Sequence, residues 1–268
     1  MEDFNSEFDT LFIPIKGKIY TSENFPHILY DQTVLNIKDR VPKDIKCGST
    51  MEQYTYLSGS IRARRIDEKV TEFLNNNENG IVVELSCRLS TACYRIQTNN
   101  KWYCIDSARN IKIREQLFEK RENVTNIKSD IYNYTWLNQI MKDNPNCPIL
   151  IICVGVFNYY QKATVDKFLH HIFKTKNIEI IFDAVNHIGM KRMKKFYKQM
   201  GIKDYKTLFS INDISELKLE NTNCTLLDYQ VFFDNINKKR IGLLTRIYMK
   251  IADVFKMIQI YHISTRNM

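Results

Sequence analysis

Glycine is scarce in this sequence, with 8 glycines in 268 residues. This is under half of the roughly 7% found in an average protein, so a function built on a glycine-rich loop has few residues to use. The seven cysteines contain no Cys-x-x-Cys pair, and the first ten residues contain no apolar stretch of an export signal. We therefore expect reduced thiols in a cytoplasmic protein without a metal centre.

Long hydrophobic runs are also missing. The longest nearly uninterrupted one extends from Pro148 to Phe157, about half of what a helix needs to cross a bilayer. On this ground we expect no membrane partner.

The charge is positive, with 39 Lys and Arg against 30 Asp and Glu, a net charge of +9. Modest clusters occur at Lys191–Lys198 and Lys238–Arg240, but lysine and asparagine are abundant nearly everywhere. We interpret the positive charge as the result of a general abundance of lysine along the chain and not of a dedicated binding surface. Because no strip of alternating basic and aromatic residues is visible, the sequence does not favour a nucleic-acid partner.

The N-terminal part, residues 1–79, is predicted to be a helical cap belonging to the same domain. Ser22 is suited to begin a helix with Pro26 in its first turn. A second helix is predicted from about Ser58 to Leu74, where apolar residues recur on one side. The polar run Asn75–Gly80 ends it.

From residue 80 onward short apolar strands alternate with helical stretches, which indicates a parallel sheet with right-handed crossovers. We predict an α/β fold, a doubly wound seven-stranded sheet over residues 80–268, with a lid near 188–220 that begins with a helix over 188–201. The predicted strands are 81–85, 102–106, 124–127, 148–154, 178–183, 225–233 and 255–263.

Ligands of such sheets bind beyond the carboxyl ends of the strands, beside the first strand. Asp106 ends the second predicted strand, 22 residues after Glu84. A carboxylate there can accept both hydroxyl groups of a ribose, or it can cap the following helix. Asp130 follows the third strand and is placed to meet the polar edge of an adenine.

The ordered motifs of the chain resemble one methyltransferase family, the S-adenosylmethionine-dependent enzymes that include leucine carboxyl methyltransferase and the tetracenomycin-pathway O-methyltransferase. Among them is the pattern R-x-R-x-x-D, which begins at Arg62. The segments that carry the resemblance are Thr10–Lys16, Ile28–Asp31, Ile61–Asp67, Val83–Leu85, Leu89–Thr91, Tyr94–Ile96, Trp102–Asp106, Tyr134–Leu137 and Phe182–Asp183.

The resemblance implies S-adenosylmethionine as the cofactor and gives several residues a role. Arg62 would reach the methionine carboxylate, with a surface ion pair to Asp67 or Glu68 as the alternative. Tyr159 would face the cofactor and acceptor, unless it is a core tyrosine, and Arg95 is either a family residue or purely structural. The residues implied at the cofactor are Arg62, Glu84, Ser86, Arg88, Asp106, Asp130, Ile131 and Gly155.

The sequence departs from the family where the cofactor should bind. The family turn E-x-G-x-G-L reads Glu84–Leu89 here, with Ser86 and Arg88 in place of both glycines. The glycines permit a positive φ and a close approach of the backbone to the ligand. Val154 stands where the family has a glutamate for the cofactor's ammonium group.

Two functions follow from this conflict. One is a working O-methyltransferase acting on a carboxylate or hydroxyl of a small molecule or a peptide end, with Tyr159 and His187 nearest the acceptor. The other is a degenerate relative that has lost the cofactor and acts as a binding or scaffold partner. The sequence indicates neither the acceptor nor the oligomeric state.

Overall fold

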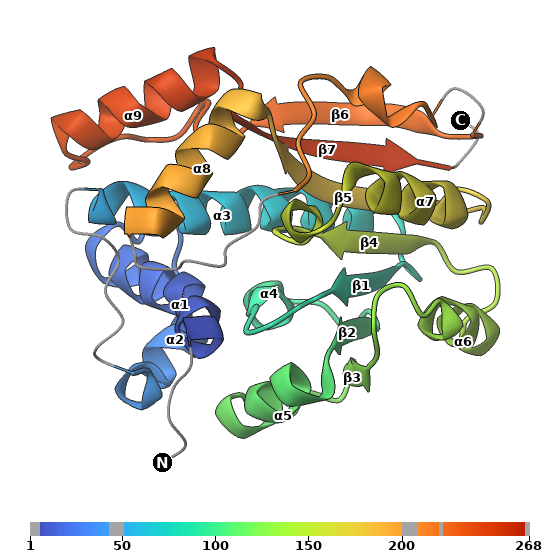
Figure 1. Ribbon diagram of the computed structural model, residues 1–268. Coiled ribbons are helices and arrows are strands. Elements are labelled where there is room, and N and C mark those ends of the chain that lie inside the picture. Colours follow the sequence, from blue (N-terminus) through green and yellow to red (C-terminus); the bar gives the residue numbers. More distant parts are fainter. Residues whose placement is uncertain (1–5, 43–50, 200–207, 220–221, 266–268) are drawn as a thin grey trace.

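The computed structural model describes residues 6–42, 51–199, 208–219 and 222–265. Seven strands form one sheet in the order β3-β2-β1-β4-β5-β7-β6, and β7 runs antiparallel to the other six (Figure 1). This is the doubly wound seven-stranded sheet predicted from the sequence. The strands are β1 Ile81–Leu85, β2 Trp102–Asp106, β3 Val124–Lys128, β4 Ile149–Cys153, β5 Ile178–Val185, β6 Thr225–Val231 and β7 Ile258–Ser264.

The central strands were predictable because every residue in them is buried. In β1, β4 and β5 all positions are covered by helices on both faces, which selects continuous apolar, β-branched runs. The strand order reverses between β1 and β4: β2 and β3 are added on one side of β1, and β4 and β5 follow on the other. β1 and β4 are parallel neighbours, and the switch point lies between them. The carboxyl ends of β1, β2 and β4 therefore meet at the crevice where ligands of such sheets bind.

Helices cover both faces of the sheet (Figure 1). α3, α5 and α9 contribute to the apolar core on one face, and α6 and α7 to that on the other. The helices are α1 Ser6–Asn24, α2 Gln32–Asn36, α3 Glu52–Asn76, α4 Ala92–Arg95, α5 Ala108–Leu117, α6 Thr135–Asp143, α7 Lys162–Ile172, α8 His187–Gln199 and α9 Leu243–Val254.

The helix boundaries near the N-terminus differ from the prediction. Ser22 lies inside α1, and its hydroxyl accepts a hydrogen bond from the backbone N–H of Asp31 instead of capping a new helix. Pro26 follows the end of α1 in a turn. It marks the end of one helix instead of the start of another, because proline also follows helix C-termini.

The C-terminal part contains a helix that the sequence interpretation missed. α9 ends at Val254, so β7 begins at Ile258 and not at residue 255 as predicted. α8 runs over 187–199, close to the predicted 188–201; the end of that prediction and lid residues 200–207 lie outside the described residues. The division into a cap and a core stays a prediction.

A buried ionic network joins the N-terminal helices to the sheet. Arg95 pairs with Asp67 through two hydrogen bonds of 2.7 and 2.8 Å, and with Asp31 at 2.8 Å. The Thr91 hydroxyl donates to Asp31 at 2.5 Å, and Lys18 donates to that hydroxyl at 3.0 Å. Arg95 is therefore a structural residue in this protein, the second of the two roles considered for it.

Charges in this network influence one another strongly. Burial opposes ionisation of Asp31, but Arg95, Lys18 and the Thr91 hydroxyl together hold the pKa of its carboxyl below the usual value. Burial and the nearby Arg95 lower the pKa of Lys18 to about 8, against the opposing effect of Asp31. The network therefore depends on the Asp31 carboxylate staying ionised.

Candidate functional site

The loop after β1 keeps a glycine-like backbone without glycine. Ser86 has a φ of 47° and Arg88 a φ of 46°, both in the left-handed region that favours glycine. A non-glycine residue held there costs on the order of 1–3 kcal/mol and persists only when its surroundings demand it. Both positions where the family has glycine therefore keep a backbone conformation that favours glycine.

Asp106 anchors this loop at the end of β2. Its Oδ2 accepts the Arg88 backbone N–H at 2.7 Å. Its Oδ1 accepts the Ser107 backbone N–H at 2.7 Å and the Asn110 side-chain amide at 2.8 Å. The helix-capping role considered for Asp106 belongs to Ser107, whose hydroxyl accepts the Asn110 backbone N–H.

These bonds limit what Asp106 can bind. A carboxylate offers about four acceptor positions, and three are used inside the protein. One position remains for a ligand hydroxyl, on the oxygen that also holds the loop. The role of Asp106 as acceptor for both ribose hydroxyls stays a prediction, and it requires one of these internal bonds to be exchanged for the second hydroxyl.

Gly155, Arg62 and Asp183 meet at the carboxyl ends of β4 and β5. The Gly155 N–H donates to Asp183 Oδ1 at 2.5 Å, and Arg62 Nη1 pairs with Asp183 Oδ2 at 3.1 Å. Gly155 has a φ of 71°, and a Cβ there would lie 3.2 Å from Arg62 Nη1. Its positive φ favours glycine at 155, and Arg62 forms this pair with Asp183 instead of the ion pair with Asp67 or Glu68 that was the alternative interpretation.

Asp183 was missed as a site residue. It is 2% exposed at the end of a buried strand, and an acid at that place was a usable signal. Its partner Arg62 lies 121 positions away in the chain, so the pair itself could not be read from local spacing.

Arg88 reaches from the loop after β1 to the loop after β4. Its guanidinium carbon lies 5.9 Å from the centre of the Tyr159 ring, within the range of a cation–π contact. Tyr159 is 39% exposed, so it is not the core tyrosine that was the alternative interpretation. The two side chains bridge the crevice between the carboxyl ends of β1 and β4.

Glu84 lies beneath the loop and is 8% exposed. Burial raises the pKa of its carboxyl, against the opposing effect of Arg114, a hydrogen bond with Ser90, and Lys18. Its Oε2 has no hydrogen-bond partner among the described residues. A buried carboxyl oxygen left unpaired costs about 1–3 kcal/mol, and burial favours the neutral form of this carboxyl.

Three buried thiols also lie beneath the loop, on Cys87, Cys93 and Cys104. The hydrogen bond with Cys87, together with burial, holds the pKa of the Cys104 thiol well above its usual value. The hydrogen bond with Cys104, followed by burial, raises the pKa of Cys93 in the same way. Thiols with raised pKa values are poor nucleophiles, so Cys93 and Cys104 are structural.

The remaining predicted residues are placed differently. Asp130 is exposed after β3, and its Oδ1 accepts the Tyr132 backbone N–H. Ile131 is 3% exposed and packs in the core with Trp136. His187 is exposed at the start of α8, and its Nδ1 lies 2.5 Å from Asn212 Oδ1. Of these three, Asp130 and His187 present polar groups at the surface.

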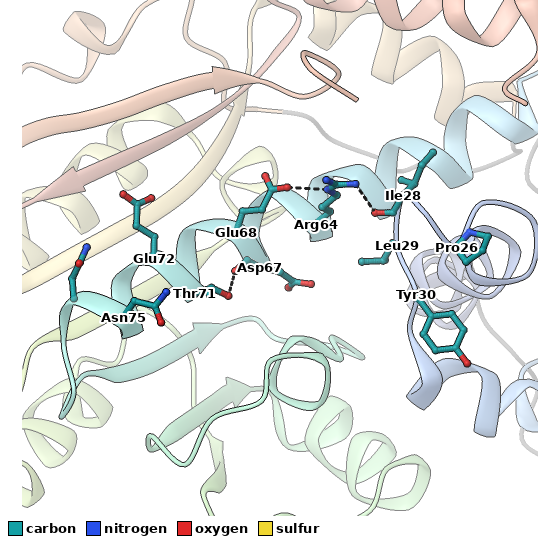
Figure 2. Close-up of a pocket in the computed structure, with 11 residues that line it drawn as sticks. Pro26, Ile28, Leu29, Tyr30, Arg64, Asp67, Glu68, Thr71, Glu72 and Asn75 are labelled. Atoms are coloured by element: carbon teal, nitrogen blue, oxygen red, sulfur yellow. Dashed lines mark hydrogen bonds and ion pairs between the residues drawn. The ribbon is translucent and has the colours of Figure 1, made fainter. Parts of the chain in front are cut away.

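Two clefts lie elsewhere on the molecule. One of about 770 Å³ follows α3 beside the Pro26–Tyr30 turn, and Figure 2 shows its lining of Asp67, Glu68 and Glu72. It lies along the side of α3 and not beyond the ends of β1 and β4, so we do not assign it to the cofactor. A second cleft of about 350 Å³, between α3 and α9, has four tyrosines in its lining.

No protein-family model matches the chain. A curated relative, the tetracenomycin polyketide synthesis O-methyltransferase of Streptomyces glaucescens, is 22% identical over 180 residues. The match covers 66% of this chain and 65% of the relative, so the chain spans about two thirds of that protein. The family resemblance seen in the sequence motifs is confirmed by this relative.

Solved structures match over nearly the whole chain. A DUF574 family protein from Streptomyces avermitilis gives a TM-score of 0.57 at 10% identity, covering 93% of this chain and 96% of its own. The fold is that of the S-adenosylmethionine-dependent methyltransferases. The magnesium protoporphyrin IX methyltransferase of Synechocystis, solved with bound SAH (S-adenosylhomocysteine), gives a TM-score of 0.51 at 11% identity, covering 92% of this chain and 96% of its own. A methyltransferase from Anabaena variabilis gives a TM-score of 0.52 at 12% identity, covering 95% of this chain and 94% of its own.

Proposed function

We propose that this chain is an S-adenosylmethionine-dependent O-methyltransferase acting on a carboxylate or hydroxyl of a small molecule or a peptide end. The observation that carries the proposal is the left-handed backbone at both Ser86 and Arg88. A loop that no longer approached a ligand would be free to relax to an unstrained path. Here the strain is kept, and Asp106 fixes the loop through the Arg88 N–H.

The groups around the crevice match the chemistry of the cofactor. Asp106 offers one acceptor position to the ribose, and Glu84, which the family resemblance also implies at the cofactor, lies buried beneath the same loop. Arg62 is already paired with Asp183. Arg88 is therefore the cation that would meet the methionine carboxylate, after leaving the face of Tyr159.

When bound, the cofactor supplies an electrophilic methyl group attached to a sulfonium. A carboxylate acceptor needs only to be held in line with that group, so positioning provides most of the rate acceleration. A hydroxyl acceptor must also lose a proton. His187 is suited to take this proton. The Asn212 amide group donates to Glu216, so Asn212 Oδ1 is the acceptor facing the imidazole and His187 Nδ1 carries the proton. The lone pair of the ring is then on Nε2, which can act as a base.

The second candidate function is a binding or scaffold protein without the cofactor. The observation that favours it is the contact between Arg88 and Tyr159, which closes the crevice where the methionine part of the cofactor would pass. Val154 points to the same function, since it cannot accept a hydrogen bond from an ammonium group.

Calorimetric titration of the purified protein with S-adenosylmethionine and with SAH separates the two candidates. For the enzyme we expect a dissociation constant below about 100 μM, or about 5.5 kcal/mol of binding free energy. Release of SAH in the presence of carboxylate- and hydroxyl-containing acceptors then tests turnover. No heat with either ligand, at concentrations well above that limit, would favour the binding protein.

Replacing Asp106 by asparagine is expected to weaken SAH and adenosine equally, by about 1.5–3 kcal/mol, because one charge-assisted hydrogen bond to the ribose is lost. Asparagine keeps an acceptor for the Arg88 N–H and so limits damage to the loop. Free methionine, which has no ribose, serves as the control in the same competition measurement. Unchanged adenosine affinity with a lowered melting temperature would make Asp106 purely structural.

A further inference from the structure

The positive charge of this protein is concentrated in two segments and is not spread by composition as the sequence suggested. Residues 187–199 and 234–256 contain eleven Lys and Arg and two Asp, a net charge of +9. This equals the net charge of the whole chain, and the rest of the sequence holds 28 residues of each sign. Elsewhere in the chain, acidic residues lie between the basic ones, and their charges cancel. Clusters of basic residues alone do not reveal this cancellation.

The fold brings the two segments together. α8 begins directly after β5, and the Asn186 side chain donates to the Phe255 carbonyl at the end of α9. Gly189 in the first turn of α8 lies so close to this turn that a Cβ would be 2.2 Å from the Met257 carbonyl oxygen. Figure 1 shows the start of α8 next to the end of α9, with both helices at the end of the sheet where β1 and β4 terminate. The basic residues of α8 are exposed: Lys191, Arg192, Lys194, Lys195 and Lys198.

α9 adds a row of exposed apolar side chains to this basic region. Its buried side consists of Thr245, Met249 and Ala252, while the opposite side projects large aliphatic groups from the molecule. Arg246 and Lys250 lie exposed between turns of the same helix. The exposed apolar residues, with their exposed fractions, are Leu243 70%, Leu244 68%, Val254 66%, Phe255 52% and Ile247 45%.

We propose that this basic–apolar surface, made of α8, residues 238–240 and the outward side of α9, docks on an anionic lipid bilayer. Basic helices with an exposed aliphatic side lie in the interface between headgroups and acyl chains, with the apolar groups inserted and the cations near lipid phosphates. None of the described helices is long and apolar enough to cross a membrane, and interfacial binding requires no such helix.

Other occupants fit this surface less well. A second copy of the chain would place two strongly positive faces against each other, which opposes a symmetric contact. A nucleic acid would pair with the cations but would leave the aliphatic side chains of Leu243, Ile247 and Val254 in water. An anionic bilayer satisfies both the charge and the apolar groups.

The test is flotation of the full-length protein with lipid vesicles. We expect binding to vesicles containing about 30% phosphatidylglycerol and at least tenfold weaker binding to pure phosphatidylcholine. The double change Leu243→Asp with Val254→Asp should weaken binding about tenfold or more by removing the inserted groups. The double change Lys194→Glu with Lys195→Glu should have an effect of similar size by reversing two cations.

Matched controls change the same chemistry elsewhere. Met141→Asp alters an exposed apolar residue on α6, and Lys112→Glu with Lys176→Glu reverses two exposed cations on α5 and after α7. We expect both controls to bind vesicles like the parent, and thermal melts to show all variants folded, since each altered side chain is exposed.

Three results would overturn the proposal. The first is no binding to anionic vesicles. The second is binding that Leu243→Asp with Val254→Asp leaves unchanged, which would indicate general attraction to polyanions. The third is a dimer in sedimentation velocity that the same variant dissociates, without vesicle binding, which would make the surface an interface between copies. None of these measurements depends on methyl transfer.

Discussion

Replacing Asp31 by alanine should lower the free energy of unfolding by about 3–5 kcal/mol. The change removes a fully buried carboxylate that pairs with Arg95 and accepts from Thr91, and it leaves the cation of Arg95 with only Asp67. Breaking a buried ion pair from one side costs this much because a desolvated charge remains. Urea denaturation followed by circular dichroism measures the loss.

Two further variants separate the ion pair of Asp31 from its role as a helix cap. Asp31 also caps α2, since its Oδ1 accepts the Val34 N–H at 3.2 Å. Asp31→Asn keeps an acceptor for this cap and should therefore be about 1 kcal/mol less damaging than alanine. Asp39→Ala, an exposed acid nearby, serves as the control and should change stability by less than about 0.5 kcal/mol. A loss below about 1 kcal/mol for Asp31→Ala would show that the network is not coupled to folding.

The same network predicts how the stability of the folded protein changes with pH. Because the pKa of Asp31 is lower in the folded protein than in the unfolded chain, its stabilising effect is complete above the unfolded pKa of about 4. The effect is lost as the pH falls through the folded pKa. Asp31→Asn should therefore lose less stability than the parent on acidification below about pH 4.

Replacing Arg88 by glycine should weaken SAH binding by about 3 kcal/mol, roughly two orders of magnitude. The reason is the loss of a charge-assisted contact to the methionine carboxylate, which Arg62 cannot replace while paired with Asp183. The loop should keep its shape, because glycine adopts the left-handed φ of Arg88 without strain. Calorimetric titration of both proteins with SAH gives the difference.

S-adenosylmethionine provides the internal control for this prediction. It carries a sulfonium that SAH lacks, and a guanidinium about 4 Å from that charge repels it by roughly 4 kcal/mol at an effective dielectric constant near 20. The loss caused by Arg88→Gly should thus be smaller for S-adenosylmethionine than for SAH. Tighter binding of both ligands would show instead that Arg88 blocks the crevice. In that case, adding Val154→Glu should strengthen binding further by restoring the acceptor for the ammonium group. This result would support the second candidate function, a relative that has lost the cofactor.

The fold could be predicted where burial dictates composition. β1, β4 and β5 are covered on both faces, so their apolar runs stood out at once. α9 was missed although its residues do show the one-sided pattern that identifies a helix at the surface of a protein. Its periodicity was a usable signal that the sequence interpretation overlooked.

The candidate site was predictable only in part. The end of β2 gave Asp106, and the family turn gave Ser86 and Arg88, because strand ends and glycine positions are local features. The partners of these residues are not local. The bond from Arg88 to Asp106 spans 18 positions, and the contact of its side chain with Tyr159 depends on a rotamer that no spacing encodes.

The position of β7 has a consequence for the order in which this protein can fold during synthesis. β7 lies between β5 and β6 and pairs with both, yet it is the last of these seven strands to be synthesised. Until then β5 ends the parallel sheet with an unpaired edge, and β6 has no partner strand. Because exposed edges invite pairing with other chains, the nascent protein has an open sheet until Ser264 is made, and its vulnerable interval covers the whole synthesis of α8, β6 and α9.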